Sequence, residues 1–321
     1  METLYLTLFI IAFVLLFMIE VVGRIVSGII VGKMLYFKYL VRKNPEDWGH
    51  RCSDPDDYEQ HLMWDEGLAW AEQHKDRRKE VDIVSDGYKL HGEYFDFGGS
   101  KAVIIVPGRT ESLCYSYFYA PAYQKQGVNV LLIDKRGHGG SEGKYEDNGE
   151  NSYVDIHAWA KMLHDDFGIE DITLHGICIG CSLCCFALSS PACPSYIKRF
   201  IADGMYETFC LTFKNHMKKE KRPVFPYCYT AMLFGRKYAK ADFIHNGPVK
   251  QIGKVRVPTL LIYTELDDFS TPEQAHRLYS LLNAEKELYF FHKGRHSHIR
   301  FHNAEEYDAT CKRWLETKAN S

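Results

Sequence analysis

The chain has 321 residues, of which 46% are hydrophobic, so it is long enough to bury a full core in one catalytic-sized domain with an appendage. Its 39 Lys and Arg residues nearly balance its 42 Asp and Glu residues, which leaves a net charge of -3. A chain without an excess of positive charge has no general attraction for a phosphate backbone, so we expect no nucleic-acid partner.

The appendage lies at the N-terminus. Residues Leu4–Ile19 are apolar apart from Thr7, and the apolar run resumes at Val21 after Glu20. This is about the length that crosses the hydrocarbon core of a bilayer, so the sequence predicts a single membrane-spanning helix. The alternative is a hydrophobic helix that packs on the core of the domain itself.

The flanks of this segment bear on its retention and orientation. The first three residues include no Lys or Arg and no Ala-x-Ala site follows, unlike a cleaved signal peptide, so we expect the segment to be retained. Basic residues gather on the C-terminal side of the span, and the positive-inside rule then places the rest of the chain on the cytoplasmic face of the membrane. These residues are Arg24, Lys33, Lys38, Arg42 and Lys43.

Three parts follow one another along the chain. Residues 1–44 are predicted as the anchor with a juxtamembrane helix, residues 45–80 as a helical linker, and residues 81–321 as one α/β domain. Within the domain, predicted strands alternate with predicted helices, which is typical of a mostly parallel sheet covered on both faces. The strands are expected at 101–106, 128–133, 171–175, 197–202, 259–263 and 287–291, with a helix over 112–126. Residues from about 205 to 249 break this rhythm and are predicted to form a lid.

Residues 174–182 read Leu-His-Gly-Ile-Cys-Ile-Gly-Cys-Ser, which sets Cys178 between Gly176 and Gly180. A predicted buried strand precedes this pattern and an apolar helix follows it. A Gly-x-nucleophile-x-Gly pattern requires that context, because the nucleophile sits on a strained turn and the glycines let strand and helix pass closely. The sequence therefore predicts Cys178 as the nucleophile of a covalent mechanism.

Three further cysteines, Cys181, Cys184 and Cys185, lie on the helix predicted after Cys178. Their spacing loosely resembles a metal or iron–sulfur run, but short apolar residues at these positions must pack on the sheet. We therefore expect these cysteines in the core, and we expect no metal and no cofactor. A redox-sensor role would require exposed thiols on this helix.

A carboxylate and a histidine follow Cys178 in the order that a nucleophile–acid–histidine triad requires. Asp267 comes just after the strand at 259–263, and His296 comes after the strand at 287–291. Both side chains are therefore expected at the carboxyl edge of the sheet, where they can meet Cys178. The alternatives are Asp268 and Asp203 for the acid and His298 for the histidine.

The segment Pro107-Gly-Arg-Thr-Glu-Ser112 follows the strand at 101–106. The family resemblance that this segment carries implies that the backbone N–H of Arg109, together with that of Ile179, holds a developing oxyanion. Backbone donors suit this task because they are fixed before the charge appears, and the loss of one donor lowers the rate about a hundredfold or more.

Two segments carry a resemblance to a known family, Pro107–Ser112 and Ile133-Asp-Lys-Arg-Gly-His-Gly-Gly-Ser-Glu-Gly143. Residues 81–318 resemble an α/β-hydrolase of the lysophospholipase and monoacylglycerol lipase type, a group similar to the serine aminopeptidase-like hydrolases, with Cys in place of the nucleophilic Ser. The resemblance implies the α/β-hydrolase fold, with a mostly parallel eight-stranded sheet, helices on both faces and a lid insertion. It also implies that His138 is a turn residue and not the catalytic base.

Together these features predict a membrane-anchored hydrolase that cleaves carboxylic esters, of lipids or of other acyl groups, with a triad of Cys178, His296 and Asp267 and a covalent acyl-enzyme. A thioester intermediate also reacts with amines and thiols, so an acyltransferase or thioesterase is one alternative. A catalytically inactive binding protein on the same fold is another.

Overall fold

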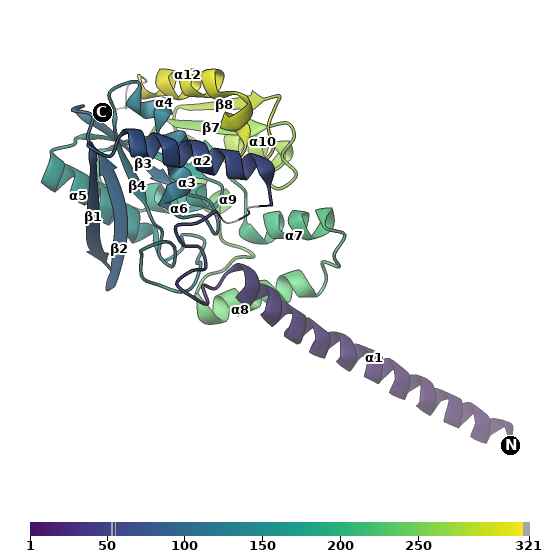
Figure 1. The fold of residues 1–321 in the computed structure, drawn as a ribbon. Coiled ribbons are helices and arrows are strands. Elements are labelled where there is room, and N and C mark those ends of the chain that lie inside the picture. The colour runs from purple at the N-terminus through teal and green to yellow at the C-terminus, as the bar shows by residue number, and fades with distance from the viewer. Residues whose placement is uncertain (53, 55, 317–321) are drawn as a thin grey trace.

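The computed structural model describes residues 1–52, 54 and 56–316. One long helix projects from a body in which a twisted sheet is covered by helices on both faces (Figure 1). The N-terminus lies at the far end of that helix, whereas the C-terminal helix lies on the opposite side of the body (Figure 1).

The sheet has eight strands in the order β1-β2-β4-β3-β5-β6-β7-β8. The pairs β1/β2 and β2/β4 are antiparallel, and all the other pairs are parallel. The mostly parallel eight-stranded sheet predicted from the sequence is thereby confirmed. The strands are β1 (Arg78–Ser85), β2 (Tyr88–Phe95), β3 (Lys101–Val106), β4 (Asn129–Ile133), β5 (Asp171–Ile177), β6 (Ile197–Asp203), β7 (Thr259–Thr264) and β8 (Lys286–Phe291).

The central strands are apolar along their whole length instead of alternating. All residues of β4 and β7 are buried, as are all but the first residue of β3. This pattern follows from helices on both faces, because every side chain of such a strand points into a core. One core lies between the sheet and α5 (Tyr153–Phe167), α6 (Ile179–Ser189) and α10 (Pro272–Leu281). The other core includes α2 (Tyr58–Gln73), α3 (Leu113–Ser116), α4 (Pro121–Gln124) and α12 (Ala304–Leu315).

The segment predicted as one helix over 112–126 is broken into α3, the 3-10 helix η1 (Tyr117–Tyr119) and α4. Pro121 explains the break, since it has no N–H to continue a helical ladder. The short helices that complete the body are α9 (Pro248–Gln251), the 3-10 helix η2 (Ile252–Lys254) and α11 (Ile299–His302).

The N-terminal helix, α1 (Glu2–Tyr39), is unbroken over 38 residues. It contains an 18-residue window with a mean hydropathy of 2.7, none of it buried, so by length and composition it can span a membrane. From Gly28 onward, α1 packs along α8 (Tyr227–Tyr238).

The segment predicted as a lid contains α7 (Phe209–Lys219) and α8. Both helices share a third hydrophobic cluster with the C-terminal part of α1. The cluster includes Tyr36, Leu40 and Val41 from the end of α1 and just after it, and Phe213 and Met232 from the two lid helices. The end of α1 and the lid helices therefore form one packed unit.

Candidate active site

Cys178 lies on the turn between β5 and α6, at the carboxyl edge of the sheet. Its backbone has φ 53° and ψ -115°, a conformation that residues with a side chain rarely adopt. The flanking glycines are required by space, since a Cβ on Gly176 would lie 2.6 Å from Cα of Cys181 and one on Gly180 would lie 2.2 Å from the carbonyl oxygen of Val106. Close packing on both sides thus holds the half-buried Cys178 on this strained turn.

A histidine and a carboxylate from two other loops lie beside this turn. Nδ1 of His296, after β8, donates a hydrogen bond to Oδ2 of Asp267, after β7, at 2.6 Å. Oδ1 of Asp267 accepts hydrogen bonds from the backbone N–H groups of Phe269 and Ser270, each at 2.8 Å. These two bonds fix the buried carboxylate, so it holds the imidazole in one orientation.

The pKa of His296 depends on both of its neighbours, Asp267 and Cys178. Burial by itself would lower the pKa of His296, but the negative charges of Asp267 and Cys178 and the hydrogen bonds of the imidazole to both side chains raise the pKa well above its ordinary value. The imidazole of His296 therefore holds its proton to a higher pH than a free histidine does.

The alternative residues lie in other environments. Asp268 is exposed and pairs with Lys219 at 2.7 Å. Nδ1 of His298 donates to the backbone carbonyl of His296 at 2.8 Å, and its Nε2 lies 3.2 Å from Arg295. The structure therefore brings Cys178, His296 and Asp267 together, and it places Asp268 and His298 in contacts of their own.

Asp203, the third candidate acid, belongs to a buried chain of polar side chains under the site. Its Oδ2 accepts a hydrogen bond from the hydroxyl of Tyr307 at 2.7 Å, and this hydroxyl lies 3.0 Å from Nε2 of His175. Nδ1 of His175 accepts in turn from Tyr123 at 2.8 Å. Burial raises the pKa of Asp203 to about 7 and lowers that of His175 to about 3, so His175 is neutral.

The loop after β3 contributes backbone donors at the same edge of the sheet. The N–H of Gly108 is held by Oε2 of Glu111 at 2.8 Å, and Thr110 has φ 64°. In the described part of the chain, the N–H groups of Arg109 and Ile179 donate to no protein acceptor. Ile179 is the first residue of α6, where backbone N–H groups have no intrahelical partner. Both groups are therefore available to an oxyanion.

These elements surround a cavity of about 330 Å³, at the small end of the range for ligand sites. Cys178 and His296 line it together with the loop after β3, and the lid helix α7 forms another wall. Sequence reasoning did not single out the lining residues Phe209, Phe213, His216 and Phe269. No local pattern marks them, because the lid and the loops converge only in the folded chain.

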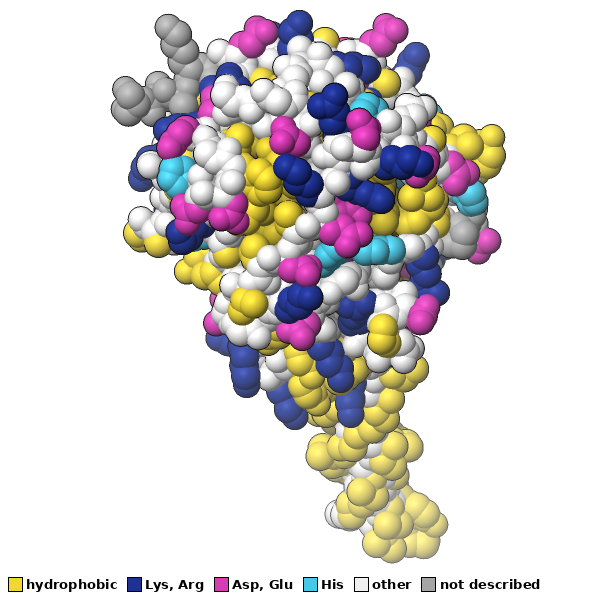
Figure 2. Space-filling view, turned by 60° about the vertical axis from the view of Figure 1, so that its left-hand side comes forward, with side chains coloured by type: hydrophobic (Ala, Val, Ile, Leu, Met, Phe, Trp, Pro, Cys, Tyr) yellow, Lys and Arg dark blue, Asp and Glu magenta, His cyan; other side chains and the backbone are white. Residues whose placement is uncertain are grey.

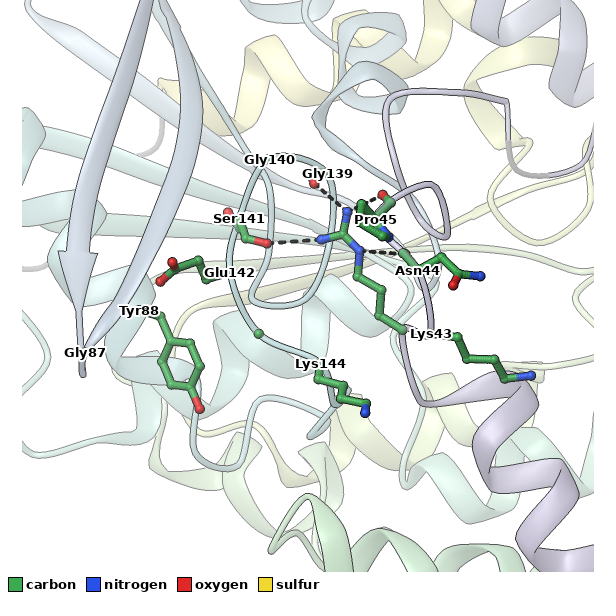
Figure 3. A pocket seen from close by; sticks show the side chains of 12 residues that line it. Lys43, Asn44, Pro45, Gly87, Tyr88, Gly139, Gly140, Ser141, Glu142 and Lys144 are labelled. Atoms are coloured by element: carbon green, nitrogen blue, oxygen red, sulfur yellow. Dashed lines mark hydrogen bonds between the residues drawn. The ribbon is translucent and has the colours of Figure 1, made fainter.

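A larger hollow of about 690 Å³ lies between the segment after α1 and the loop at residues 139–144. Tyr88 and Glu142 lie on one side of it, and Asn44 and Pro45 on the other (Figure 3). The guanidinium of Arg42 crosses it and donates to backbone carbonyls of that loop at 2.8 and 3.1 Å. None of the candidate catalytic side chains lines this hollow, which lies where the segment after α1 meets the body.

The other residues singled out in the sequence, His138 and three cysteines, are buried and do not line the cavity. His138 is buried and stacks on Trp48 with ring centroids 4.7 Å apart, away from the cavity. Cys181, Cys184 and Cys185 are buried in the core under the sheet. Within the described ranges, no group of three or more His, Cys, Asp or Glu residues is placed to hold a metal ion.

The sheet order, the strained turn after β5 and the side chains after β7 and β8 define the α/β-hydrolase fold, which the sequence predicted. In agreement, residues 101–227 match the protein family described as alpha/beta hydrolase fold.

Several known proteins resemble this chain. The uncharacterized protein YqkD of Bacillus subtilis (strain 168) is 24% identical over 302 residues, which cover 92% of this chain and 94% of YqkD. Among solved structures, the esterase Pf2001 of Pyrococcus furiosus matches with a TM-score of 0.64 at 24% identity, over 76% of this chain and 94% of that one. The esterase EaEST from Exiguobacterium antarcticum matches with a TM-score of 0.57 at 14% identity, over 74% of this chain and 100% of that one. These likenesses establish a shared fold.

Proposed function

We propose that this protein is a membrane-anchored hydrolase of carboxylic esters, with Cys178 as nucleophile, His296 as general acid and base, and Asp267 as the residue that orients His296. One observation carries the proposal: Cys178 stands on a strained turn in a cavity that also contains His296, and the ring of His296 is bonded to a buried carboxylate. The esterases among the similar solved structures support ester hydrolysis as the reaction class.

In the first half of the proposed reaction, the thiolate of Cys178 attacks the carbonyl carbon of the ester. The carbonyl oxygen becomes an oxyanion and accepts hydrogen bonds from the N–H groups of Arg109 and Ile179. The tetrahedral intermediate then collapses and the bond from carbon to the alkoxy oxygen breaks. The leaving alkoxide takes the proton of the His296 imidazolium, which leaves a thioester on Cys178.

In the second half, water attacks the thioester carbon and gives its proton to His296. The bond from carbon to sulfur breaks, the carboxylic acid leaves, and the thiolate–imidazolium pair is restored. Asp267 stays ionised throughout and keeps the imidazole in the orientation that both halves need.

The lining of the cavity favours an acyl group as the part of the substrate that is bound. Phe209 and Phe213 of α7 and Phe269 after β7 line it, and aromatic rings offer apolar contact to a hydrocarbon chain. A helix able to span a membrane, on the same chain, supports esters that partition into lipid. The same acyl-enzyme would also transfer its acyl group to an amine or a thiol.

The proposal is tested by ester and thioester hydrolysis with the full-length protein in detergent, comparing the wild type with Cys178→Ala and Cys178→Ser. We expect Cys178→Ala to lose turnover and to lose the acyl adduct seen by intact-mass spectrometry after a short mixing time, because no nucleophile remains. Adding amines or thiols to the assay separates hydrolysis from acyl transfer.

Cys193→Ala is the matched control, since Cys193 is also half-buried but does not line the cavity. It should retain the activity of the wild type. Equal turnover by the wild type and Cys178→Ala would refute the triad, and the absence of any turnover or adduct would favour a binding protein on this fold.

A further inference from the structure

Positive charge is unevenly distributed along this chain. Residues 21–43 and 214–240 hold 13 of the 39 Lys and Arg residues but only one of the 42 Asp and Glu residues. The rest of the chain has 26 basic and 41 acidic residues. A protein with a net charge of -3 therefore contains two short segments that are strongly basic and a remainder that is strongly acidic.

The fold brings the two basic segments together. A Cβ on Gly28 of α1 would lie 2.9 Å from Cγ of Pro226, and one on Gly32 would lie 2.6 Å from Cβ of Thr230 in α8. On the face that Figure 2 shows, dark blue side chains gather at the narrow end of the body, where the apolar helix leaves it. We define the basic collar as six basic side chains of these two segments: Lys33, Lys38, Lys218, Lys221, Arg236 and Lys237.

The charges of the basic collar are not neutralised within the protein. All six side chains are exposed, and none of them forms an ion pair in the part of the chain that the structure describes. The next basic residues, Lys219 and Arg222, do pair with carboxylates, Asp268 and Glu220. A group of unpaired basic side chains beside a helix that can span a membrane is suited to an anionic surface.

Apolar side chains project from the same end of the body. Phe225, in the loop between α7 and α8, is 78% exposed, and Leu233 on α8 is 54% exposed. Phe225 directly precedes Pro226 and so lies at the level of Gly28. Gly28 is six residues past Val22, or about 9 Å along the helix axis, which corresponds to the headgroup layer if the apolar run spans the hydrocarbon core.

We propose that the basic collar and Phe225 form a lipid-binding surface, on which the lid docks to anionic phospholipid headgroups while Phe225 enters the acyl boundary. This inference rests on the proposed membrane anchoring. The charge pattern and the exposed aromatic side chain are those of an interfacial membrane segment. Helix α7 carries Lys218 near its C-terminal end and the cavity residues Phe209 and Phe213 near its start. When the basic collar binds the headgroups, α7, which is one wall of the cavity, therefore lies close to the bilayer. Ester substrates dissolved in the bilayer would then reach Cys178 past α7.

Tyr39, at the end of α1, connects this surface to the cavity. Its hydroxyl accepts a hydrogen bond from Arg222 at 3.0 Å, and its carbonyl accepts one from the guanidinium of Arg109 at 3.5 Å. Its ring also contacts that of Phe213 edge-on, with centroids 5.5 Å apart. The position of the lid loop on the membrane is therefore coupled by direct contacts to the loop that holds the N–H of Arg109.

The test uses the full-length protein in nanodiscs and measures quenching of tryptophan fluorescence by brominated phospholipids. Three variants each add one tryptophan to the five native ones: Phe225→Trp at the proposed surface, Phe13→Trp in α1, and Leu281→Trp at an exposed position on α10. We expect lipid quenching of Phe225→Trp in discs with anionic phospholipid, weaker than for Phe13→Trp and absent for Leu281→Trp.

Charge reversal tests the collar. Lys33→Glu, Lys218→Glu and Lys237→Glu together should abolish the quenching of Phe225→Trp, since each lysine near an anionic surface contributes about a fivefold factor to binding. The control is the same change at three exposed lysines outside the collar, Lys250, Lys254 and Lys312, which should leave the quenching intact.

The outcomes separate this inference from the proposed chemistry. Quenching of Phe13→Trp without quenching of Phe225→Trp would overturn the inference while the anchor stands. Equal quenching of Phe225→Trp in neutral discs, unaffected by charge reversal, would overturn the role of anionic lipid. Absent quenching of Phe13→Trp would overturn both the anchor and the docked lid, whereas ester hydrolysis in detergent tests the triad independently of all three.

Discussion

Two aspartates at the ends of neighbouring strands have opposite tasks in this structure. Asp267 accepts two backbone N–H bonds in addition to the bond from His296, so both of its carboxylate oxygens have partners. Asp203 accepts one bond, from Tyr307, and its Oδ1 has no partner among the described residues. The contacts of Asp267 suit a residue that orients a histidine. Burial with one unpartnered oxygen favours the neutral, protonated form of Asp203.

We expect Asp267→Asn to lower kcat by about a thousandfold or more, because an amide neither holds the required imidazole tautomer nor stabilises the imidazolium. Asp268→Asn is the matched control, one residue away, and should have little effect because Asp268 pairs with Lys219 at the surface. Steady-state kinetics with the ester that the wild type hydrolyses best checks both. A larger loss for Asp268→Asn would reverse the assignment.

Asp203 predicts a dependence of stability on pH. Between the ordinary carboxyl pKa of about 4 and the raised pKa of about 7, the folded protein holds a proton that the unfolded chain has released. Stability therefore falls as the pH rises through this window and levels off above it. Asp203→Asn cannot ionise, so its thermal midpoint should exceed that of the wild type at pH 8 by more than at pH 5.

Thermal unfolding of the wild type and Asp203→Asn at the two pH values checks this prediction, with Asp268→Asn as the variant that removes an exposed carboxylate instead. A constant difference in midpoint between the wild type and Asp203→Asn would show that Asp203 is ionised across the whole range.

At the scale of elements, the contact between α1 and α8 depends on small residues. Gly28 faces Pro226, the residue before α8, and Gly32 faces Thr230 on α8, and neither position has room for a side chain. Small residues at such contacts let two helices approach closely along their length. The end of α1 is consequently packed against the segment that the sequence predicts as a lid.

We expect Gly32→Leu to force α1 and α8 apart, because even its Cβ would overlap Thr230. Overpacking of this kind typically lowers stability by about 1–3 kcal/mol. Trypsin should then cut faster after Lys218, Lys219 or Lys221, at the end of α7 and in the loop that follows it. Gly23→Leu is the control, since a Cβ at Gly23 has no atom within 4 Å, and it should leave the cleavage rate unchanged. Equal rates for both variants would mean that the contact does not stabilise the lid.

At the scale of the whole molecule, α1 and the body are not independent units. Tyr36, Leu40 and Val41 are buried together with Phe213 and Met232 of the lid. An N-terminal truncation therefore has two different consequences, depending on whether it removes only the exposed part of α1 or also the part inside this cluster.

We expect a protein lacking residues 1–24 to fold with an intact lid, and one lacking residues 1–44 to lose lid order. Removing three buried apolar side chains forfeits about 1.5–3 kcal/mol for each of them, a large part of a typical stability of about 5–15 kcal/mol. Binding of a hydrophobic dye and hydrogen exchange of α7 and α8 measure the difference. Equal protection of these helices in both truncated proteins would show that the end of α1 is not needed for the lid.

The sequence determined much of this protein through local patterns. Hydrophobic periodicity and turn residues predict the strands and their mostly parallel arrangement, because each pattern reflects how its own segment meets water or core. The glycines around Cys178 predict the strained turn, since only glycine fits at those two close approaches. The apolar run of α1 predicts a helix long enough to span a membrane. All of these predictions rest on residues that are close together in the sequence.

Only the tertiary structure decided which distant residues meet. It joins Asp267 and His296, and not Asp268 and His298, because the direction of each side chain at a loop end depends on how that loop packs. It also sets Phe209 and Phe213 at the cavity and seats the end of α1 in the lid. These contacts link residues from 29 positions apart, for Asp267 and His296, to more than 150 apart, for the end of α1 and the two helices α7 and α8. Local periodicity shows which face of a segment is buried, but it does not show which other segment buries that face.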